Sequence, residues 1–169
     1  MKQPEKAILE FDKLVKEAPL NPSTYRYRGS AYGKAGDFDK AMADYSKAIE
    51  MEPKNADFYY GRGVFYYRKD DFKNAILDFN KAIELNPEKV SALYNRGTTY
   101  YRMGNGEAAY ADFVKVMKLR PFKSVFRMRI LYKLAAVGIT ETTGYRMDKG
   151  HSHRRSGRPN NEPESIYVP

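Results

Sequence analysis

A period of 34 residues constrains this chain more than any other feature of its sequence. Glycine, tyrosine and proline each recur at that spacing, as Gly29, Gly63 and Gly97, as Tyr32, Tyr66 and Tyr100, and as Pro53, Pro87 and Pro121. A period of this length is typical of chains that stack copies of one small unit, none of which buries a core alone. The sequence therefore predicts three consecutive units, residues 22–55, 56–89 and 90–123.

Each unit contains two segments in which apolar residues recur at helical spacing. Short turns separate the two segments, at Gly36-Asp37, Asp70-Asp71 and Gly104-Asn105-Gly106. The prolines end the second segment of each unit, because proline cannot donate the backbone hydrogen bond that a helix interior needs. We therefore expect a helical hairpin in each unit, made of a first helix (helix A) and a second helix (helix B).

The repeated glycines lie inside the predicted helices A, where a glycine costs about 1 kcal/mol relative to alanine. Three such glycines in one register indicate that the two helices of each hairpin approach closely. We expect these glycines to face small residues of helix B, namely Gly29 against Ala41 and Ala48, Gly63 against Ala75 and Ala82, and Gly97 against Ala109. The tyrosines of the same register, Tyr32, Tyr66 and Tyr100, are expected in the core.

At these residues the chain resembles the tetratricopeptide repeat family. The matching stretches, all within residues 22–123, are YRGSAYGKAGDFDKAMADYSKAIEMEP, GRGVFYYRKDDFKNAILDFNKAIELNP and NRGTTYYRMGNGEAAYADFVKVMKLRP. The resemblance implies an all-α fold, a right-handed superhelical solenoid of antiparallel helix hairpins. Helices A would line its concave groove and helices B would face outward. It also implies a non-enzymatic scaffold or adaptor that binds other proteins.

Both ends of the chain continue the register. Residues 1–21 are interpreted as an N-terminal half repeat whose helix B spans 4–18, and residues 124–138 as a C-terminal cap similar to helix A. Residues 139–169 are polar, basic and punctuated by glycine and proline, which predicts a disordered tail.

Composition narrows the functional classes. The chain has 30 Lys and Arg against 21 Asp and Glu, and this net charge of +9 favours acidic peptides, anionic lipid or nucleic acid as partners. The lack of cysteine excludes disulfides, a cysteine nucleophile and thiolate metal sites. No apolar run is long enough for a membrane span or a signal-peptide core, and we expect a cytoplasmic protein.

The charges divide between the two kinds of helix, since the helices A are basic and the first three helices B are net acidic. Three arginines of the helices A each precede an aspartate by 16 residues, as Arg28 and Asp44, Arg62 and Asp78, and Arg96 and Asp112. This spacing predicts an ion pair inside each hairpin, which would leave these arginines unavailable to a ligand. Position 130 of the last helix A holds isoleucine instead of arginine.

The family pattern indicates which side chains face the groove. The candidate binding residues are Arg26, Lys34, Tyr60, Tyr67, Arg68, Tyr94, Tyr101 and Arg102. Other residues expected to point there are Ser23, Ser30, Gly33, Asp57, Val64, Ser91 and Thr98. Tyrosines give a large contact area at low entropic cost and arginines bind carboxylates, so this surface suits an extended acidic or C-terminal peptide. Packing between repeats is the alternative role for Tyr67 and Tyr101.

Relatives that bind the acidic C-termini of heat-shock chaperones use a carboxylate clamp of lysine, asparagine and arginine. The matching positions of this chain hold Arg26, Ser30, Gly61, Ser91 and Asn95. Only Arg26 keeps the required charge, which disfavours a chaperone-tail ligand.

Catalytic and cofactor motifs are absent from the sequence. The only histidines, His151 and His153, lie in the tail, and a pair of histidines on a flexible segment is a weak metal site. The repeated glycines lie inside helices, so they do not form a phosphate-binding loop. We therefore expect no enzyme activity, no cofactor and no metal.

Two alternatives to peptide binding remain. Single-stranded nucleic acid could stack on the tyrosines while the tail segment Arg154–Arg158 neutralises phosphates. Head-to-tail self-assembly could pair the helix at 4–18 with the helix at 124–137 of another copy. A monomer in which both half repeats cap the solenoid is the simpler interpretation.

Overall fold

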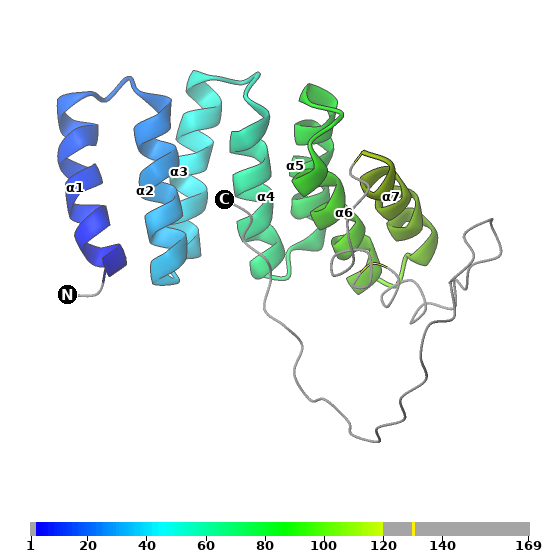
Figure 1. The fold of residues 1–169 in the computed structure, drawn as a ribbon. Coiled ribbons are helices and arrows are strands. Elements are labelled where there is room, and N and C mark those ends of the chain that lie inside the picture. Colours follow the sequence, from blue (N-terminus) through cyan, green and yellow to red (C-terminus); the bar gives the residue numbers. More distant parts are fainter. Residues whose placement is uncertain (1–2, 120–129, 131–169) are drawn as a thin grey trace, which may run out of the picture. The chain divides into compact units, whose positions relative to one another are not determined.

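The computed structural model describes residues 3–119 and Ile130. Within residues 3–119 the chain forms α-helices joined by short turns (Figure 1), and all of these helices belong to one compact unit of the chain. In order they are α1 (Gln3–Glu17), α2 (Pro22–Ala35), α3 (Phe38–Met51), α4 (Ala56–Arg68), α5 (Phe72–Leu85), α6 (Val90–Arg102) and α7 (Gly106–Leu119). The predicted C-terminal half repeat, apart from Ile130, and the tail lie outside the described residues.

Consecutive helices pack against one another along the whole series. The pairs α2–α3, α4–α5 and α6–α7 are the three hairpins, and α1 packs on α2. Helices A (α2, α4 and α6) also contact one another from repeat to repeat, as α2 with α4 and α4 with α6. The predicted all-α repeat solenoid is therefore confirmed.

Short polar side chains fix where α2, α3, α4 and α5 begin. Asn21 and Asn55 accept a hydrogen bond from a backbone N–H two residues later, at the starts of α2 and α4. Asp37 and Asp71 do the same for the N–H three residues later, at the starts of α3 and α5. These caps satisfy donors that a helix start leaves unpaired.

The turn between helices A and B needs a left-handed residue. Gly36 has φ +87° and Gly104 has φ +77°, the conformation that glycine adopts at no steric cost. Asp70 holds the same place in the second hairpin with φ 58°. Aspartate tolerates this region better than most residues, so the hairpin forms without a glycine.

The core of each hairpin is an aromatic ring from helix B that lies against the glycine of helix A. An added Cβ at Gly29 would come within 3.0 Å of the Tyr45 ring. At Gly63 it would come within 2.8 Å of Phe79, and at Gly97 within 2.9 Å of Phe113. The predicted contact of Gly29 with Ala41 is present at the Ala41 carbonyl, 3.1 Å away, but the rings are the nearest neighbours in all three hairpins.

The three tyrosines expected in the core, Tyr32, Tyr66 and Tyr100, are half-buried, and Tyr32 and Tyr100 pack against the edge of the core. Two of the three also lie beside arginine guanidinium groups. Arg28 lies 6.0 Å from the ring centre of Tyr32, and Arg62 lies 5.9 Å from that of Tyr66. Guanidinium groups at this distance from a ring are attracted to its face.

Helix α1 differs from the other helices B because none of its residues is buried. Ala7 is half-buried, whereas its equivalents Ala41, Ala75 and Ala109 are fully buried. Within residues 3–119, no helix is long and apolar enough to cross a membrane.

Candidate functional site

Three arginines of the helices A form the predicted ion pairs, which are confirmed in every hairpin. Each guanidinium donates from Nε and Nη2 to both carboxylate oxygens of its aspartate. The two donor–acceptor distances are 2.9 and 2.7 Å for Arg28 and Asp44, 2.8 and 2.8 Å for Arg62 and Asp78, and 2.8 and 2.6 Å for Arg96 and Asp112. The hydrogen bond to the aspartate is the main reason why the pKa of each arginine is raised.

The same arginines also reach back to the preceding repeat. The third nitrogen, Nη1, donates to Asp12 at 2.9 Å from Arg28, to Ser46 at 3.0 Å from Arg62, and to Asn80 at 2.6 Å from Arg96. These acceptors precede their arginines by 16 residues, as the aspartates follow them by 16. Each guanidinium therefore links two helices B through the helix A that lies between them. All three arginines thus have a structural role.

Two candidate cations, Arg26 of α2 and Arg68 of α4, have no carboxylate partner in the part of the chain that the structure describes. Both are half-buried. The guanidinium of Arg26 lies 4.1 Å from the ring centre of Tyr27. That of Arg68 lies 5.8 Å from Phe38 and 6.0 Å from Phe65. Aromatic faces hold both cations in place, and no carboxylate among residues 3–119 pairs with either of them.

The other two candidate cations have different surroundings. Arg102 forms an ion pair with Asp70 at 3.1 Å, and its guanidinium lies 5.0 Å from Phe72 and 5.6 Å from Tyr67. Its side chain is 47% exposed. Lys34 is exposed on the last turn of α2. Arg102 thus shares its charge with a carboxylate of the protein itself, which weakens its candidacy relative to Arg68.

The candidate tyrosines are half-buried, and three of them pack against a phenylalanine. Ring centres are 6.1 Å apart for Tyr60 and Phe79, 5.8 Å for Tyr67 and Phe72, and 5.8 Å for Tyr94 and Phe113. The Tyr60 hydroxyl accepts a hydrogen bond from Asn95 at 3.1 Å. Tyr101 packs at the edge of the core formed by α6 and α7. These contacts hold the rings in place, and part of each ring surface stays accessible.

Two residues expected to point into the groove are covered. Thr98 is buried at 8% exposure. Gly33 is buried under the Phe65 ring of the next helix A, so that an added Cβ would lie 2.2 Å from that ring. For these two positions the prediction of an accessible surface is wrong, because neighbouring side chains fill the space.

The positions of the chaperone-tail clamp are also occupied by internal packing. An added Cβ at Gly61 would lie 2.0 Å from the Tyr45 ring. The Tyr45 hydroxyl is itself hydrogen-bonded to Ser30 Oγ at 2.8 Å, and Asn95 donates to Tyr60. Three of the five clamp positions are therefore engaged within the chain, which agrees with the sequence argument against that clamp.

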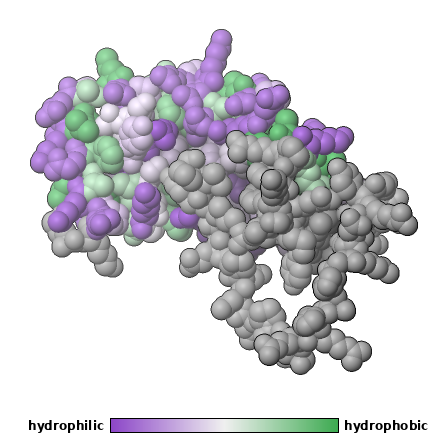
Figure 2. Space-filling model, in the orientation of Figure 1, coloured by the Kyte–Doolittle hydropathy of each residue, from purple (hydrophilic) through white to green (hydrophobic). Residues whose placement is uncertain are grey.

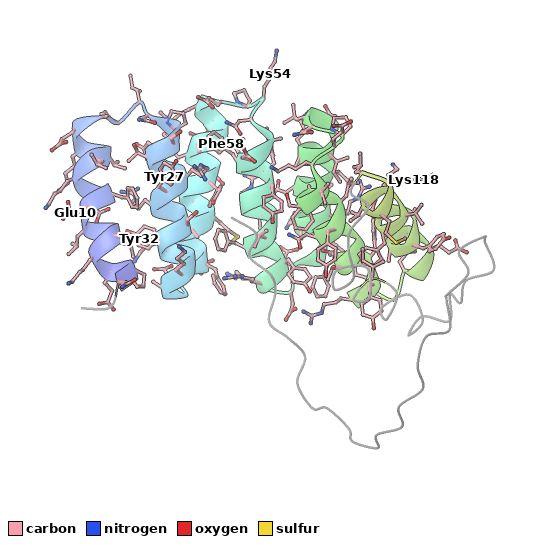
Figure 3. All side chains as sticks on the ribbon, in the orientation of Figure 1. Glu10, Tyr27, Tyr32, Lys54, Phe58 and Lys118 are labelled. Carbon is pink, nitrogen blue, oxygen red and sulfur yellow. The ribbon has the colours of Figure 1, made fainter. Side chains whose placement is uncertain are left out.

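The repeat pattern did not predict a role for Tyr27 of α2. This residue is 47% exposed (Figure 3). Its ring stacks on Phe11 of α1 with the ring centres 5.9 Å apart, and the Arg26 guanidinium lies 4.1 Å from its ring centre. The equivalent positions in the next units are Gly61 and Asn95, so the repeat pattern gave no signal for an aromatic residue there.

Within residues 3–119 and Ile130, no three His, Cys, Asp or Glu side chains come together in a way that could hold a metal ion. His151 and His153 lie outside the described residues.

Models of known protein families match most of the region that contains the three hairpins. A model described as TPR repeat matches residues 29–70 and 66–104, and one described as Tetratricopeptide repeat matches residues 90–123. Among curated proteins, none matches the sequence.

Several solved structures share the fold. The crystal structure of MamA is 23% identical with a TM-score of 0.71, over 82% of this chain and 86% of that one. The first TPR of Spaghetti (RPAP3), bound to the HSP90 peptide SRMEEVD, is 26% identical with a TM-score of 0.64, over 69% of this chain and 90% of that one. The Arabidopsis OM64 TPR domain is 24% identical with a TM-score of 0.62, over 69% and 93%.

Proposed function

The chain belongs to the tetratricopeptide repeat family, and we propose that the accessible face of its helices A binds an extended peptide with acidic groups. Repeats of this family form protein-interaction scaffolds, and the RPAP3 repeats of similar structure are bound to a peptide. The finer proposal concerns which groups of this chain would recognise the ligand and what chemistry the ligand has.

The observation that carries the proposal is the pair of cations, Arg26 and Arg68, that have no carboxylate partner within the described helices. A half-buried guanidinium has lost part of its hydration, so a carboxylate that reaches it gains a charge-assisted hydrogen bond with less competition from water. The ring behind each guanidinium reduces the entropy that ordering the side chain would cost. Because the two arginines lie on neighbouring helices A, one extended ligand with two acidic groups suits both.

Aromatic contacts would supply the rest of the affinity. The tyrosines at 60, 67, 94 and 101 and the cations Lys34 and Arg102 complete the proposed binding face. The peptide in the RPAP3 complex, SRMEEVD, also contains acidic residues, although it is bound to a protein only 26% identical to this one. Since Gly61 and Asn95 are engaged internally here, we propose recognition through the arginines and not through the chaperone-tail clamp.

Replacing both arginines tests the proposal. Selection from a displayed library of random heptapeptides is expected to enrich peptides that contain Asp and Glu. The double variant Arg26→Gln, Arg68→Gln is then expected to bind the enriched peptides at least about 100-fold more weakly in a titration, because each of the two charged hydrogen bonds contributes about 1.5–3 kcal/mol and about 1.4 kcal/mol corresponds to a factor of ten. Enrichment without acidic residues would contradict the proposal.

A matched control comes from an exposed cation on a helix B. The Lys47 side chain is 51% exposed and pairs with Glu50 on α3. Lys47→Gln removes one positive charge, as each arginine replacement does, away from the helices A. It is expected to leave the affinity within about twofold, and an equal loss in this variant would indicate nonspecific attraction to a basic protein.

A pull-down from cell lysate separates peptide from nucleic-acid binding. We expect a bound protein that survives nuclease treatment and is lost from the variant Tyr67→Ala, Tyr101→Ala, whose helical circular dichroism should match the parent. Binding that nuclease abolishes and that this variant retains would instead assign the interaction to nucleic acid.

A further inference from the structure

Helix α1 presents an open face that the other helices B bury inside their hairpins. Ala7 and Phe11 are half-buried and Leu14 is 45% exposed. The residues 34 positions later, Ala41, Tyr45 and Ala48, are 0%, 5% and 0% exposed. In α3 the partner helix α2 covers these positions, and no helix of the described chain takes that place on α1. Figure 2 shows hydrophobic residues among hydrophilic ones at this end.

A charged residue marks the same face. Glu10 precedes Asp44 by 34 residues. At this repeat position, each aspartate accepts hydrogen bonds from the arginine on helix A of its own hairpin. The Glu10 side chain is 69% exposed, and its only partner among the described residues is Lys13 on the same helix, at 3.2 Å (Figure 3). Helix α1 therefore offers both the apolar surface and the acid that a helix A uses in every complete hairpin.

The recurring partner of this surface has a defined chemistry. In all three hairpins the arginine that pairs with the acid directly precedes the glycine that contacts the ring, as Arg28-Gly29, Arg62-Gly63 and Arg96-Gly97. Glycine is needed because an added Cβ would come within about 3 Å of the ring. An arginine followed by a glycine in the middle of a helix is thus the complement of Glu10 and Phe11.

A second copy of this chain lacks that complement at its other end. Ile130 stands in the register of the arginines, and it is fully buried in its own chain with Leu93 and Phe113. Leu131 stands in the register of the glycines. A head-to-tail contact would therefore offer Glu10 no cation at this position and would place a leucine where the ring requires a glycine.

We propose that the open face of α1, formed by Ala7, Glu10, Phe11 and Leu14, is a docking site for an α-helix of a partner protein with a central Arg-Gly pair. The glycine lies against Phe11 and the arginine donates to Glu10, as in the internal hairpins. This site is separate from the peptide-binding face proposed above, since it uses α1 and needs neither Arg26 nor Arg68.

A fusion protein tests the docking geometry directly. A copy of residues 22–37, placed before Pro4 in exchange for residues 1–3, supplies an Arg-Gly helix in the 34-residue register. The fusion is expected to raise the Tm of the full chain by about 5 °C, because tethering makes the docking intramolecular. Replacing the Arg and Gly of the copied helix by Leu should abolish the gain. A fusion with no gain in Tm would overturn the proposal.

The variant Glu10→Gln distinguishes the proposed ion pair from nonspecific hydrophobic association of the added helix. It is expected to lower the Tm of the fusion and to leave the Tm of the parent unchanged. Glu50→Gln is the matched control, since Glu50 is 66% exposed and pairs with a lysine three residues away, as Glu10 does. Equal effects of Glu10→Gln in fusion and parent would contradict the proposed contact.

A labelled peptide of residues 21–37 tests the same site in trans by fluorescence anisotropy. Glu10→Gln is expected to weaken its binding about tenfold, and Arg26→Gln, Arg68→Gln should leave it unchanged. Loss of binding only in the arginine variant would place the peptide on the helices A and overturn the α1 site. That result would not affect the separate proposal for acidic peptides.

Discussion

Asp78→Ala is expected to lower the free energy of unfolding by about 3 kcal/mol, because removing one member of a buried ion pair strands the other. The Asp78 side chain is 7% exposed and accepts two hydrogen bonds of 2.8 Å from Arg62, which is itself 21% exposed. Without the carboxylate, Arg62 keeps only its bond to Ser46. Urea unfolding followed by circular dichroism measures the loss.

Two further variants show whether the loss comes from the stranded charge. Asp39→Ala removes a carboxylate that is 78% exposed and pairs with Lys69 at 2.5 Å, and it should cost no more than about 1 kcal/mol. Arg62→Met combined with Asp78→Leu removes both charges and should destabilise less than Asp78→Ala alone. A double variant as unstable as Asp78→Ala would show that packing, and not the charge, determines the effect.

Gly61→Asn, which restores the asparagine of the chaperone-tail clamp, is expected to destabilise the fold by about 3 kcal/mol and to create no affinity for the peptide SRMEEVD. The Tyr45 ring lies 2.0 Å from the place of an added Cβ. The ring has little room to move, since its other edge lies 3.0 Å from the Cβ place of Gly29 and its hydroxyl is bonded to Ser30. Overpacking of this kind typically costs about 1–3 kcal/mol, and the loss of the Tyr45 hydrogen bond adds to it.

Thermal unfolding and a titration with SRMEEVD together check this expectation. In a Tyr45→Ala background the obstructing ring is gone, so Gly61→Asn should cost much less than in the parent. The non-additivity isolates the clash between residues 45 and 61. A parent protein that accepts Gly61→Asn without loss of stability, or gains affinity for SRMEEVD, would show that the Tyr45 ring can leave this space.

The sequence predicted the features that depend on one repeat alone. Helices, turns and the Arg28–Asp44 type of pair follow from spacing within a hairpin, where 16 residues bring two side chains face to face. Contacts between repeats were harder to predict, because stacking distance is not encoded in any one unit. Three contacts between repeats were not predicted. They are the second hydrogen-bond acceptor of each arginine, the packing of the Phe65 ring on Gly33, and the stacking of Tyr27 on Phe11.

The candidate site shows the same division. The sequence identified its cations and tyrosines by register, but it could not tell which cations have a partner. Arg102 pairs with Asp70, whereas the residue that would serve Arg68 in the same way is Gly36, which has no carboxylate. That difference arises from the turn, where a left-handed residue is aspartate in one hairpin and glycine in another. The binding role of these residues remains a prediction.

Each repeated arginine bonds to one acceptor 16 residues before it and one 16 residues after it, and this limits which changes in length the chain can tolerate. If residues 56–89 were excised, Arg96 would follow the first hairpin and meet Ser46 in place of Asn80, while Asp112 would stay its partner. Every guanidinium would still find two acceptors. Deleting a number of residues that is not a whole multiple of 34 would shift a donor out of register with its acceptor wherever the deletion lies between the two. Loss or duplication of one whole unit is therefore the change in length that this chain can absorb.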